Sequence, residues 1–177
     1  YPSMFMRFPD SQVGANDPIL LPFLSDMFDW EAELAVVVGK TARHVSRERA
    51  YEYVAGYACF GDHTLRDYTR HERQVTPGKN FYHSGVFGPW IVTTDEITDP
   101  TGLTLTGRLN GEVMQQASTG DLLYDIPYLI SYLSSFSVLK PGDVIATGTP
   151  SGVGFTRKPP LWMKPGDVFE VEISSIG

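Results

Sequence analysis

The segment FDWEAELAVVVGK, residues 28–40, places two acidic residues at the start of an apolar run. Leu34 to Val38 resembles a strand, whereas Glu31 and Glu33 are poor strand formers and costly to bury. Side chains alternate between the two faces of a strand, so a spacing of two points both carboxylates to the same side. Because two like charges on one face repel each other, the pattern predicts a cation between them.

A carboxylate pair with no His or Cys nearby favours a hard cation such as Mg²⁺, Mn²⁺ or Ca²⁺. Two carboxylates rarely complete such a site, so we expect a third ligand from FGDHTLRDY, residues 60–68. Asp62 is preferred, because it follows an apolar segment and Gly61 at a point where a strand could end. Asp67 lies beside Arg66 in the sequence and is interpreted as half of a structural ion pair.

The composition is that of an ordinary globular protein. The 177 residues are 42% hydrophobic and 20% charged, which fits one domain over residues 1–177 with a sizeable core. A net charge of −7 without a basic stripe argues against nucleic acid and anionic membranes as partners. The single cysteine, Cys59, suits a reducing compartment, and we expect a cytoplasmic location. No apolar run approaches the length of a membrane span.

Periodicity predicts a strand-dominated α+β fold. Mixed β-sheets folded into a roll or barrel, with a few short helices, are favoured over a doubly wound sheet. Asn110-Gly111 is typical of the tight turn of a hairpin. The expected strands are 18–22, 31–39, the hairpin 103–118, the start of 143–154 and the end of 164–173, and the expected helices are 46–58 and 126–136.

Six segments taken in order resemble the fumarylacetoacetate hydrolase family, and together they span nearly the whole chain. They are FMRFPDSQVG, DWEAELAVVVGK, GDHTLRDY, GKNF, LNGEVMQQAST and GDVIATGTPSGVG. The resemblance implies a single catalytic domain of the family's β-roll type over residues 1–177. It also leads us to expect an N-terminal lid and an extreme C-terminus outside this chain.

The resemblance implies that Glu31, Glu33 and Asp62 bind one divalent metal ion, Mg²⁺ or Mn²⁺, with Ca²⁺ as a further option. Arg66 matches an arginine of the family's substrate site, and Lys79 matches a lysine close to metal and substrate. We therefore expect Arg66 and Lys79 to be catalytic. A lysine in a glycine-flanked loop beside a bound dication can hold negative charge that develops on substrate oxygen.

Four further residues are expected to bind substrate. Arg7 stands where the family usually has a lysine, Thr149 matches a substrate-contacting threonine, and Gln115 matches a polar pocket position. The glycines of residues 148–154 let backbone amides approach an anionic ligand. His83 occupies a position where relatives often carry a small or acidic residue. It is either a base in the pocket or a structural histidine.

The general base is a gap in this pattern. The family's hydrolases activate water with a His-Glu pair on an upstream lid, yet no histidine precedes Glu31. His63 adjoins Asp62, and on a strand it would point to the opposite face. The base therefore lies outside the chain or is a different residue.

The resemblance implies a metal-dependent hydrolase that cleaves a C–C bond of an acylpyruvate or β-diketo acid through a metal-stabilised enolate, in aromatic-compound catabolism. Its partner would be a small keto acid, and it would form a homodimer. The alternatives are a decarboxylase or an enol–keto isomerase of the same family, acting on oxaloacetate or on 2-hydroxyhepta-2,4-diene-1,7-dioate. A catalytically silent metal-binding module is the third reading.

Overall fold

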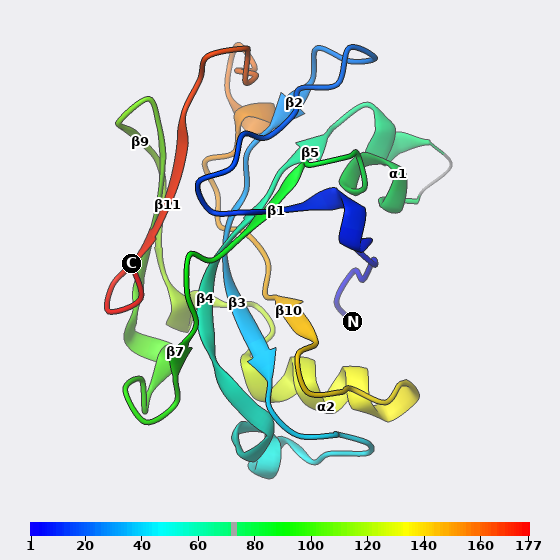
Figure 1. Ribbon diagram of the computed structural model, residues 1–177, viewed down its shortest axis with the longest axis vertical. Coiled ribbons are helices and arrows are strands. Elements are labelled where there is room, and N and C mark those ends of the chain that lie inside the picture. Colours follow the sequence, from blue (N-terminus) through cyan, green and yellow to red (C-terminus); the bar gives the residue numbers. More distant parts are fainter. Residues whose placement is uncertain (72–73) are drawn as a thin grey trace.

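The computed structural model describes residues 1–71 and 74–177, and strands dominate it (Figure 1). The strands are β1 (Gln12–Gly14), β2 (Phe28–Asp29), β3 (Ala32–Val38), β4 (Val54–Asp62), β5 (Thr64–Leu65), β6 (Gly85–Phe87), β7 (Val92–Thr93), β8 (Thr104–Leu109), β9 (Glu112–Ser118), β10 (Val144–Ala146) and β11 (Phe169–Ile173). The α-helices are α1 (Thr76–Lys79) and α2 (Ile126–Phe136). The 3₁₀ helices are η1 (Pro9–Ser11), η2 (Arg47–Tyr53), η3 (Tyr68–Arg70), η4 (Pro100–Gly102), η5 (Thr119–Asp121) and η6 (Gly154–Thr156).

The largest sheet contains six strands in the order β1-β6-β4-β3-β10, with β7 also paired to β4. β1 and β6 are parallel, whereas the other described pairs of this sheet are antiparallel. A second sheet has the order β11-β8-β9, and β2 pairs with β5. The α+β class with mixed sheets predicted from the sequence is confirmed.

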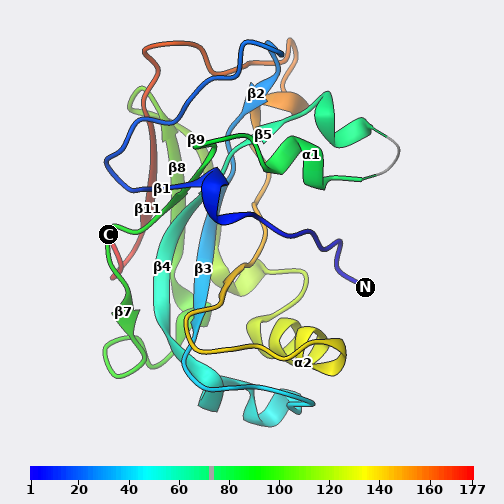
Figure 2. The ribbon, with the colours of Figure 1, turned by 45° about the vertical axis from the view of Figure 1, so that its right-hand side comes forward.

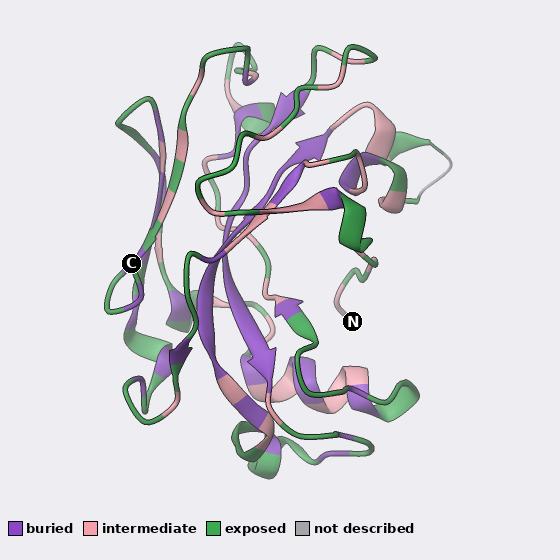
Figure 3. Cartoon of the chain, in the orientation of Figure 1, coloured by how far each residue is buried: buried purple, intermediate pink, exposed green. Residues whose placement is uncertain are grey.

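Strand β3 is buried along its whole length because both of its faces are covered (Figure 3). Leu34 and Val36 belong to the main core, which includes residues of β8, β11 and α2. On the other face, Ala35 packs in a small cluster with Ala58 and Phe60 of β4. This two-sided burial explains the uninterrupted apolar run of the sequence.

The pairing of β3 with β4 positions the acidic residues. Glu33 is opposite Phe60 in the antiparallel register. Two residues further along the ladder, the Asp62 N–H donates to the Glu31 carbonyl oxygen at 2.9 Å. Residues directly opposite each other project to the same face of a sheet, so Asp62 joins both glutamates on one face.

Two local predictions are confirmed. The turn of the β8–β9 hairpin is Asn110-Gly111, with φ values of 53° and 82°. Helix α2 has the predicted bounds, 126–136, and the Asp125 side chain accepts the Tyr128 N–H at its start. No helix in the described ranges has both the length and the apolar character that crossing a membrane would require.

Two other predictions were wrong. Residues 46–58 do not form one helix, because η2 ends at Tyr53 and the chain continues as β4 between β3 and β6. Residues 18–22 form no strand and belong to an irregular N-terminal segment. Figure 2 shows this segment running as an irregular loop from β1 to β2. The apolar residues of this segment indicated a strand, but the segment is not paired with either neighbouring sheet.

Candidate metal centre

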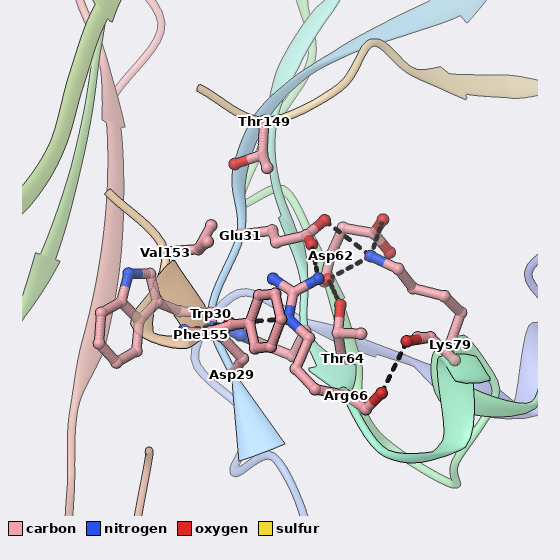
Figure 4. Close-up of polar contacts among 12 residues, drawn as sticks. Asp29, Trp30, Glu31, Asp62, Thr64, Arg66, Lys79, Thr149, Val153 and Phe155 are labelled. Atoms are coloured by element: carbon pink, nitrogen blue, oxygen red, sulfur yellow. Dashed lines mark hydrogen bonds and ion pairs between the residues drawn. The ribbon is translucent and has the colours of Figure 1, made fainter. Parts of the chain in front are cut away.

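Three buried carboxylates meet where β3 begins and β4 ends. Glu31, Glu33 and Asp62 are 7%, 3% and 1% exposed, and one oxygen of each lies within 4.8 Å of the others. Glu31 and Asp62 project toward each other in Figure 4. The shared face predicted for the two glutamates is therefore observed, and Asp62 lies where a third ligand is needed.

Cationic side chains surround two of these carboxylates. The Lys79 ammonium, at the end of α1, lies 2.7 Å from Glu31 Oε2 and 2.7 Å from Asp62 Oδ2 (Figure 4). Arg66 Nη1 lies 2.7 Å from Glu31 Oε1, and Arg7 Nη1 lies 2.7 Å from Asp62 Oδ1. Buried like charges are thereby partly neutralised, as a stable fold requires.

Glu33 is different, because no ion pair joins it to a cation within residues 1–71 and 74–177. Its Oε2 accepts the Gly148 N–H at 2.8 Å. Burial, together with repulsion from Asp62 and Glu31, raises the pKa of the Glu33 carboxyl well above its usual value. A divalent cation would supply the missing positive charge, and a donor set made of oxygen suits Mg²⁺, Mn²⁺ or Ca²⁺.

Asp29 anchors the neighbourhood of the centre and was not predicted as a site residue. Its side chain is fully buried. Oδ1 accepts the N–H groups of Trp30 at 2.8 Å and Gly154 at 2.7 Å. Oδ2 accepts the Phe155 N–H at 3.0 Å and Arg66 Nε at 2.7 Å. Asp29 therefore ties the glycine-rich loop and Arg66 to the segment that carries the glutamates (Figure 4).

A signal for Asp29 was present in the sequence. Asp29, Glu31 and Glu33 are spaced by two, so the acidic alternation begins one step before the pair that was analysed. The predicted ion pair between Asp67 and Arg66 was wrong. Arg66 pairs with Asp29 and Glu31, whereas Asp67 accepts a hydrogen bond from a serine hydroxyl of the N-terminal segment. Arg66 and Asp67 therefore contact different partners although they are adjacent in the sequence.

A pocket of about 440 Å³ opens onto the carboxylates. Its wall contains Glu31, Glu33 and Asp62, and also Thr149 from the glycine-rich loop. The other predicted site residues do not line it. Those residues are Arg7, Arg66, Lys79, His83 and Gln115.

Gln115 has a structural position. It is 1% exposed, its Oε1 accepts the Ala32 N–H at 2.9 Å, and its Nε2 donates to Thr149 Oγ1 at 2.8 Å and to the Pro150 carbonyl at 2.9 Å. Thr149 Oγ1 in turn donates to the Ala32 carbonyl at 2.9 Å. This network holds the loop against β3 and fixes the pocket wall at Thr149.

The two histidines near the site lie outside the pocket. The His83 ring stacks on Tyr82 with ring centroids 3.8 Å apart. The backbone N–H of His83 donates to the Asp10 carbonyl at 3.2 Å. His63 packs against the rings of Phe28 and Phe169, away from the carboxylates. Burial, more than the nearby cations, lowers the pKa of His63 to about 3, so this imidazole is neutral at physiological pH.

The fold and the centre define a class: a strand-rich α+β protein with three buried carboxylates that could hold a divalent cation. Residues 1–177 match the family described as fumarylacetoacetate (FAA) hydrolase C-terminal. The chain belongs to the fumarylacetoacetate hydrolase family, as its sequence motifs predicted.

Its relatives are named for different reactions. The mitochondrial oxaloacetate tautomerase Fahd2a of Rattus norvegicus is 41% identical over 177 residues, which cover 99% of this chain and 56% of the rat protein. The 2-hydroxyhepta-2,4-diene-1,7-dioate isomerase of Mycobacterium marinum has a TM-score of 0.92 and 34% identity, covering 100% of this chain and 66% of its own. A maleylpyruvate hydrolase of Sphingobium sp. SYK-6, in complex with manganese(II) and pyruvate, has a TM-score of 0.87 and 36% identity, covering 98% and 61%.

This chain thus spans little more than half the length of its rat relative. Proteins named as a tautomerase, an isomerase and a hydrolase share this fold. Family membership alone therefore does not say which bond of a substrate changes.

Proposed function

We propose that this chain catalyses a metal-dependent enol–keto tautomerisation of a small 2-oxo acid whose second carbonyl carbon is C4, so that the two carbonyl groups flank C3. The observation that carries the proposal is the buried carboxylate triad beside a pocket whose described wall contains no histidine. Tautomerisation moves a proton and needs no base to activate water. The similarity to a protein named as an oxaloacetate tautomerase supports the same reaction.

Glu31, Glu33 and Asp62 would hold the cation, and Gly148 would keep Glu33 directed into the site through its N–H. A divalent ion bound there supplies Lewis-acid stabilisation of negative charge on substrate oxygen. Arg66 contacts Glu31 Oε1 and Lys79 contacts Glu31 Oε2, so these two ion pairs fix the orientation of the Glu31 carboxylate. We propose that Lys79 and Arg66 position Glu31 as a metal ligand and lower the energy of a negatively charged substrate group nearby.

The charge balance favours an anionic substrate. Counted as ionised, the four carboxylates of the described cluster exceed the three cations by one negative charge; the groups are Asp29, Glu31, Glu33, Asp62, Arg7, Arg66 and Lys79. A divalent cation would turn this into an excess of one positive charge. The loaded site would then attract the carboxylate of a keto acid.

C–C bond hydrolysis, the reaction first expected from the sequence, is the second candidate. Similarity to the maleylpyruvate hydrolase with manganese and pyruvate favours it. Hydrolysis needs a group that activates water, and we propose that such a base would come from outside the described pocket wall. Decarboxylation, a role in aromatic catabolism, a homodimer and a cytoplasmic location stay predictions.

The reactions are separated by assaying chelator-stripped protein with and without Mg²⁺ or Mn²⁺. Acylpyruvates and oxaloacetate are supplied as enols, and enol absorbance and pyruvate are followed. We expect metal-dependent loss of enol above the rate of metal alone, without pyruvate. Pyruvate from an acylpyruvate would instead establish the hydrolase, and pyruvate from oxaloacetate the decarboxylase. No reaction in any arm would contradict both candidates and leave a silent module.

The matched variants are Glu33→Gln and Glu112→Gln. The first removes a carboxylate of the triad, whereas the second removes an exposed carboxylate at the β8–β9 turn. We expect the first to lose the metal-dependent rate and the second to keep it. Equal activity of the two variants would contradict the assignment of the triad.

A further inference from the structure

A second cavity lies on the other face of β4 from the metal centre. Its volume is about 630 Å³, against about 440 Å³ for the pocket at the carboxylates, and the two share no described lining residue. At the end of β4, Asp62 lines the pocket, whereas Gly61 and His63 line the second cavity. This division follows the alternation of side chains along a strand. The second cavity is therefore a separate space and no extension of the metal site.

Edge strands of two sheets meet at this cavity. β1 ends the order of the six-stranded sheet, and β11 ends that of the three-stranded sheet. Residues 15–19, which follow β1, and residues 167–171, which include the start of β11, both line the cavity. Figure 1 and Figure 2 show these two segments side by side, in blue and red. Only the packing of the two sheets brings these segments together.

Part of the wall of the second cavity is apolar. Ile19 and Phe169 are half-buried and pack against the core cluster that contains Phe28 and Trp30. Val168 is 59% exposed, so apolar surface there is open to a ligand. Covering such surface is favourable, and an aromatic ring can also contact a cation through its face. The cavity therefore offers contacts for an alkyl or aryl group.

The charged residues of the wall are acidic. They are Asp17, Asp167 and Glu170, and no Lys or Arg lines the cavity in the described ranges. None of the three forms an ion pair within residues 1–71 and 74–177. Asp17 and Asp167 accept hydrogen bonds in their own turns, whereas no described hydrogen bond involves the Glu170 side chain. An entering cation would find negative charge without a competing protein cation.

These three carboxylates do not form a metal site. Among the described residues, the only three acidic side chains whose ligand atoms converge closely enough for a metal ion are Glu31, Glu33 and Asp62. Carboxylates that are spread around a cavity suit an organic cation, because its hydrogen-bond donors and apolar body span more space than a metal ion does.

His63 supplies a second, independent sign of a ligand. It is 2% exposed, and its Nδ1 has no hydrogen-bond partner among the described residues. Its Nε2 lies 3.1 Å from the position that a Cβ would take at Gly61, so the ring edge faces the part of the wall that Gly61 forms. Buried polar atoms are nearly always hydrogen-bonded, so an unpartnered imidazole at a cavity wall points to a ligand that completes the bonding. An ammonium N–H can donate to the unprotonated ring nitrogen.

We propose that the second cavity binds a small organic ammonium ion, that is, a primary amine protonated at neutral pH that carries an alkyl or arylalkyl body. Asp167 and Glu170 attract the charge. The apolar wall around Ile19 and Phe169 covers the body, and the imidazole of His63 accepts an N–H. The proposal does not rest on the reaction proposed for the metal centre, because the two spaces are separate.

The test compares two compounds that differ at one group. 3-Phenylpropylammonium and 3-phenyl-1-propanol share an arylalkyl body, but only the first is charged. Isothermal titration calorimetry uses Mg²⁺-loaded protein, so that the carboxylates of the metal centre do not compete for the ammonium ion. We expect the ammonium compound to bind at least about tenfold more tightly, because hydrogen bonds to charged groups are stronger than neutral ones.

Two variants with the same chemical change locate the charge effect. Glu170→Gln removes an exposed carboxylate of the cavity wall and should weaken binding of the ammonium compound about two- to fivefold, the contribution of an exposed ion pair. Glu96→Gln removes an exposed carboxylate after β7 that lines neither space, and should leave the affinity unchanged. Thermal unfolding checks that both variants fold, which exposed positions should allow.

Nuclear magnetic resonance locates the bound compound. The chain has four histidines, and His63→Leu identifies the ring ¹⁵N signals of His63 by their loss. These signals should shift when 3-phenylpropylammonium is added to the Mg²⁺-loaded parent protein. A histidine that only packs in the core, away from the compound, would show no shift.

Equal affinity for the two compounds, or no binding of either, would overturn the proposal. A folded Glu170→Gln variant with the parent's affinity would also overturn it. Unshifted His63 signals during binding would do the same, because the compound would then lie elsewhere. The outcome of the enol assay at the metal centre does not change these results.

Discussion

Glu33 differs from the other two carboxylates of the centre in its electrostatic surroundings. Glu31 and Asp62 each contact cationic side chains, whereas Glu33 has the Gly148 N–H. Its ionised form is therefore costly until a cation binds, and its raised pKa expresses that cost. A bound cation would therefore relieve an electrostatic cost that Glu33 carries in the metal-free protein.

Replacing Glu33 by Gln should weaken metal binding at least about tenfold, as losing a direct ligand exceeds the effect of losing an outer-shell partner. In the metal-free protein, the same change should remove a pH dependence. The folded-state pKa of Glu33 is raised, so stability is lost as pH rises above the ordinary value of 4.5. Calorimetric titration with the metal measures the loss of affinity. Thermal unfolding of the protein in chelator between pH 5 and 8 measures the pH dependence of its stability. A variant with the parent's pH slope would contradict this account.

His63 should act in the opposite direction. Its pKa is about 3 in the folded protein and 6.5 when unperturbed, so the unfolded chain binds a proton first as pH falls. Stability should be lost from about pH 6.5 downward. His63→Leu should reduce this loss, measured as the change in urea midpoint between pH 7 and 4.5. An unchanged acid sensitivity would show that other groups control unfolding there.

At the scale of elements, the glycine-rich loop after β10 depends on β9 for its position. Gln115 connects β9 to β3 and to this loop through three hydrogen bonds. Gly152 has a φ of 106°, and a Cβ there would lie 2.1 Å from the Met114 carbonyl oxygen. Because Gly152 has no side chain, the loop can approach β9 closely and complete the pocket wall.

Replacing Gln115 by Met should lower the free energy of unfolding by about 1–3 kcal/mol, because the buried Ala32 N–H and the half-buried Pro150 carbonyl lose their hydrogen-bond partner. Guanidinium unfolding of metal-free protein measures the change. Gln116→Met, at the exposed neighbouring position on β9, is the matched control and should change stability little. Equal effects of the two substitutions would show that the network contributes nothing specific.

The elements also show where local sequence patterns suffice. The β8–β9 hairpin and α2 were predicted because an Asn-Gly turn and a 3.6-residue period act within a short stretch. Residues 54–58 were misassigned to a helix because their apolar spacing suits either structure. Pairing with β3 and β7 resolved that ambiguity, and such pairing depends on residues far away in the chain.

At the scale of the molecule, the metal centre joins elements that are distant in sequence. Its three carboxylates come from the residue before β3, from β3 itself and from the end of β4, and the loop after β10 donates a hydrogen bond to Glu33. A cation that binds the folded state alone should stabilise the whole fold.

Adding Mn²⁺ at about 100 times its dissociation constant should raise the free energy of unfolding of stripped protein by about 2.7 kcal/mol. Differential scanning calorimetry would record this as a higher melting temperature. Glu112→Gln should show the full increase and Glu33→Gln little of it. A similar increase in both variants would mean that the metal binds elsewhere.

The sequence by itself predicted the shared face of Glu31 and Glu33, the preference of these oxygen donors for a hard cation and Asp62 as their partner, because a strand's alternation and a family's motifs are local. Tertiary structure alone decided which oxygens Lys79 contacts, Glu31 Oε2 and Asp62 Oδ2, and that Asp29 rather than Asp67 pairs with Arg66. It also decided that Gln115 supports the pocket instead of lining it. These contacts follow from sheet register and loop closure, which bring together residues whose proximity no local pattern encodes.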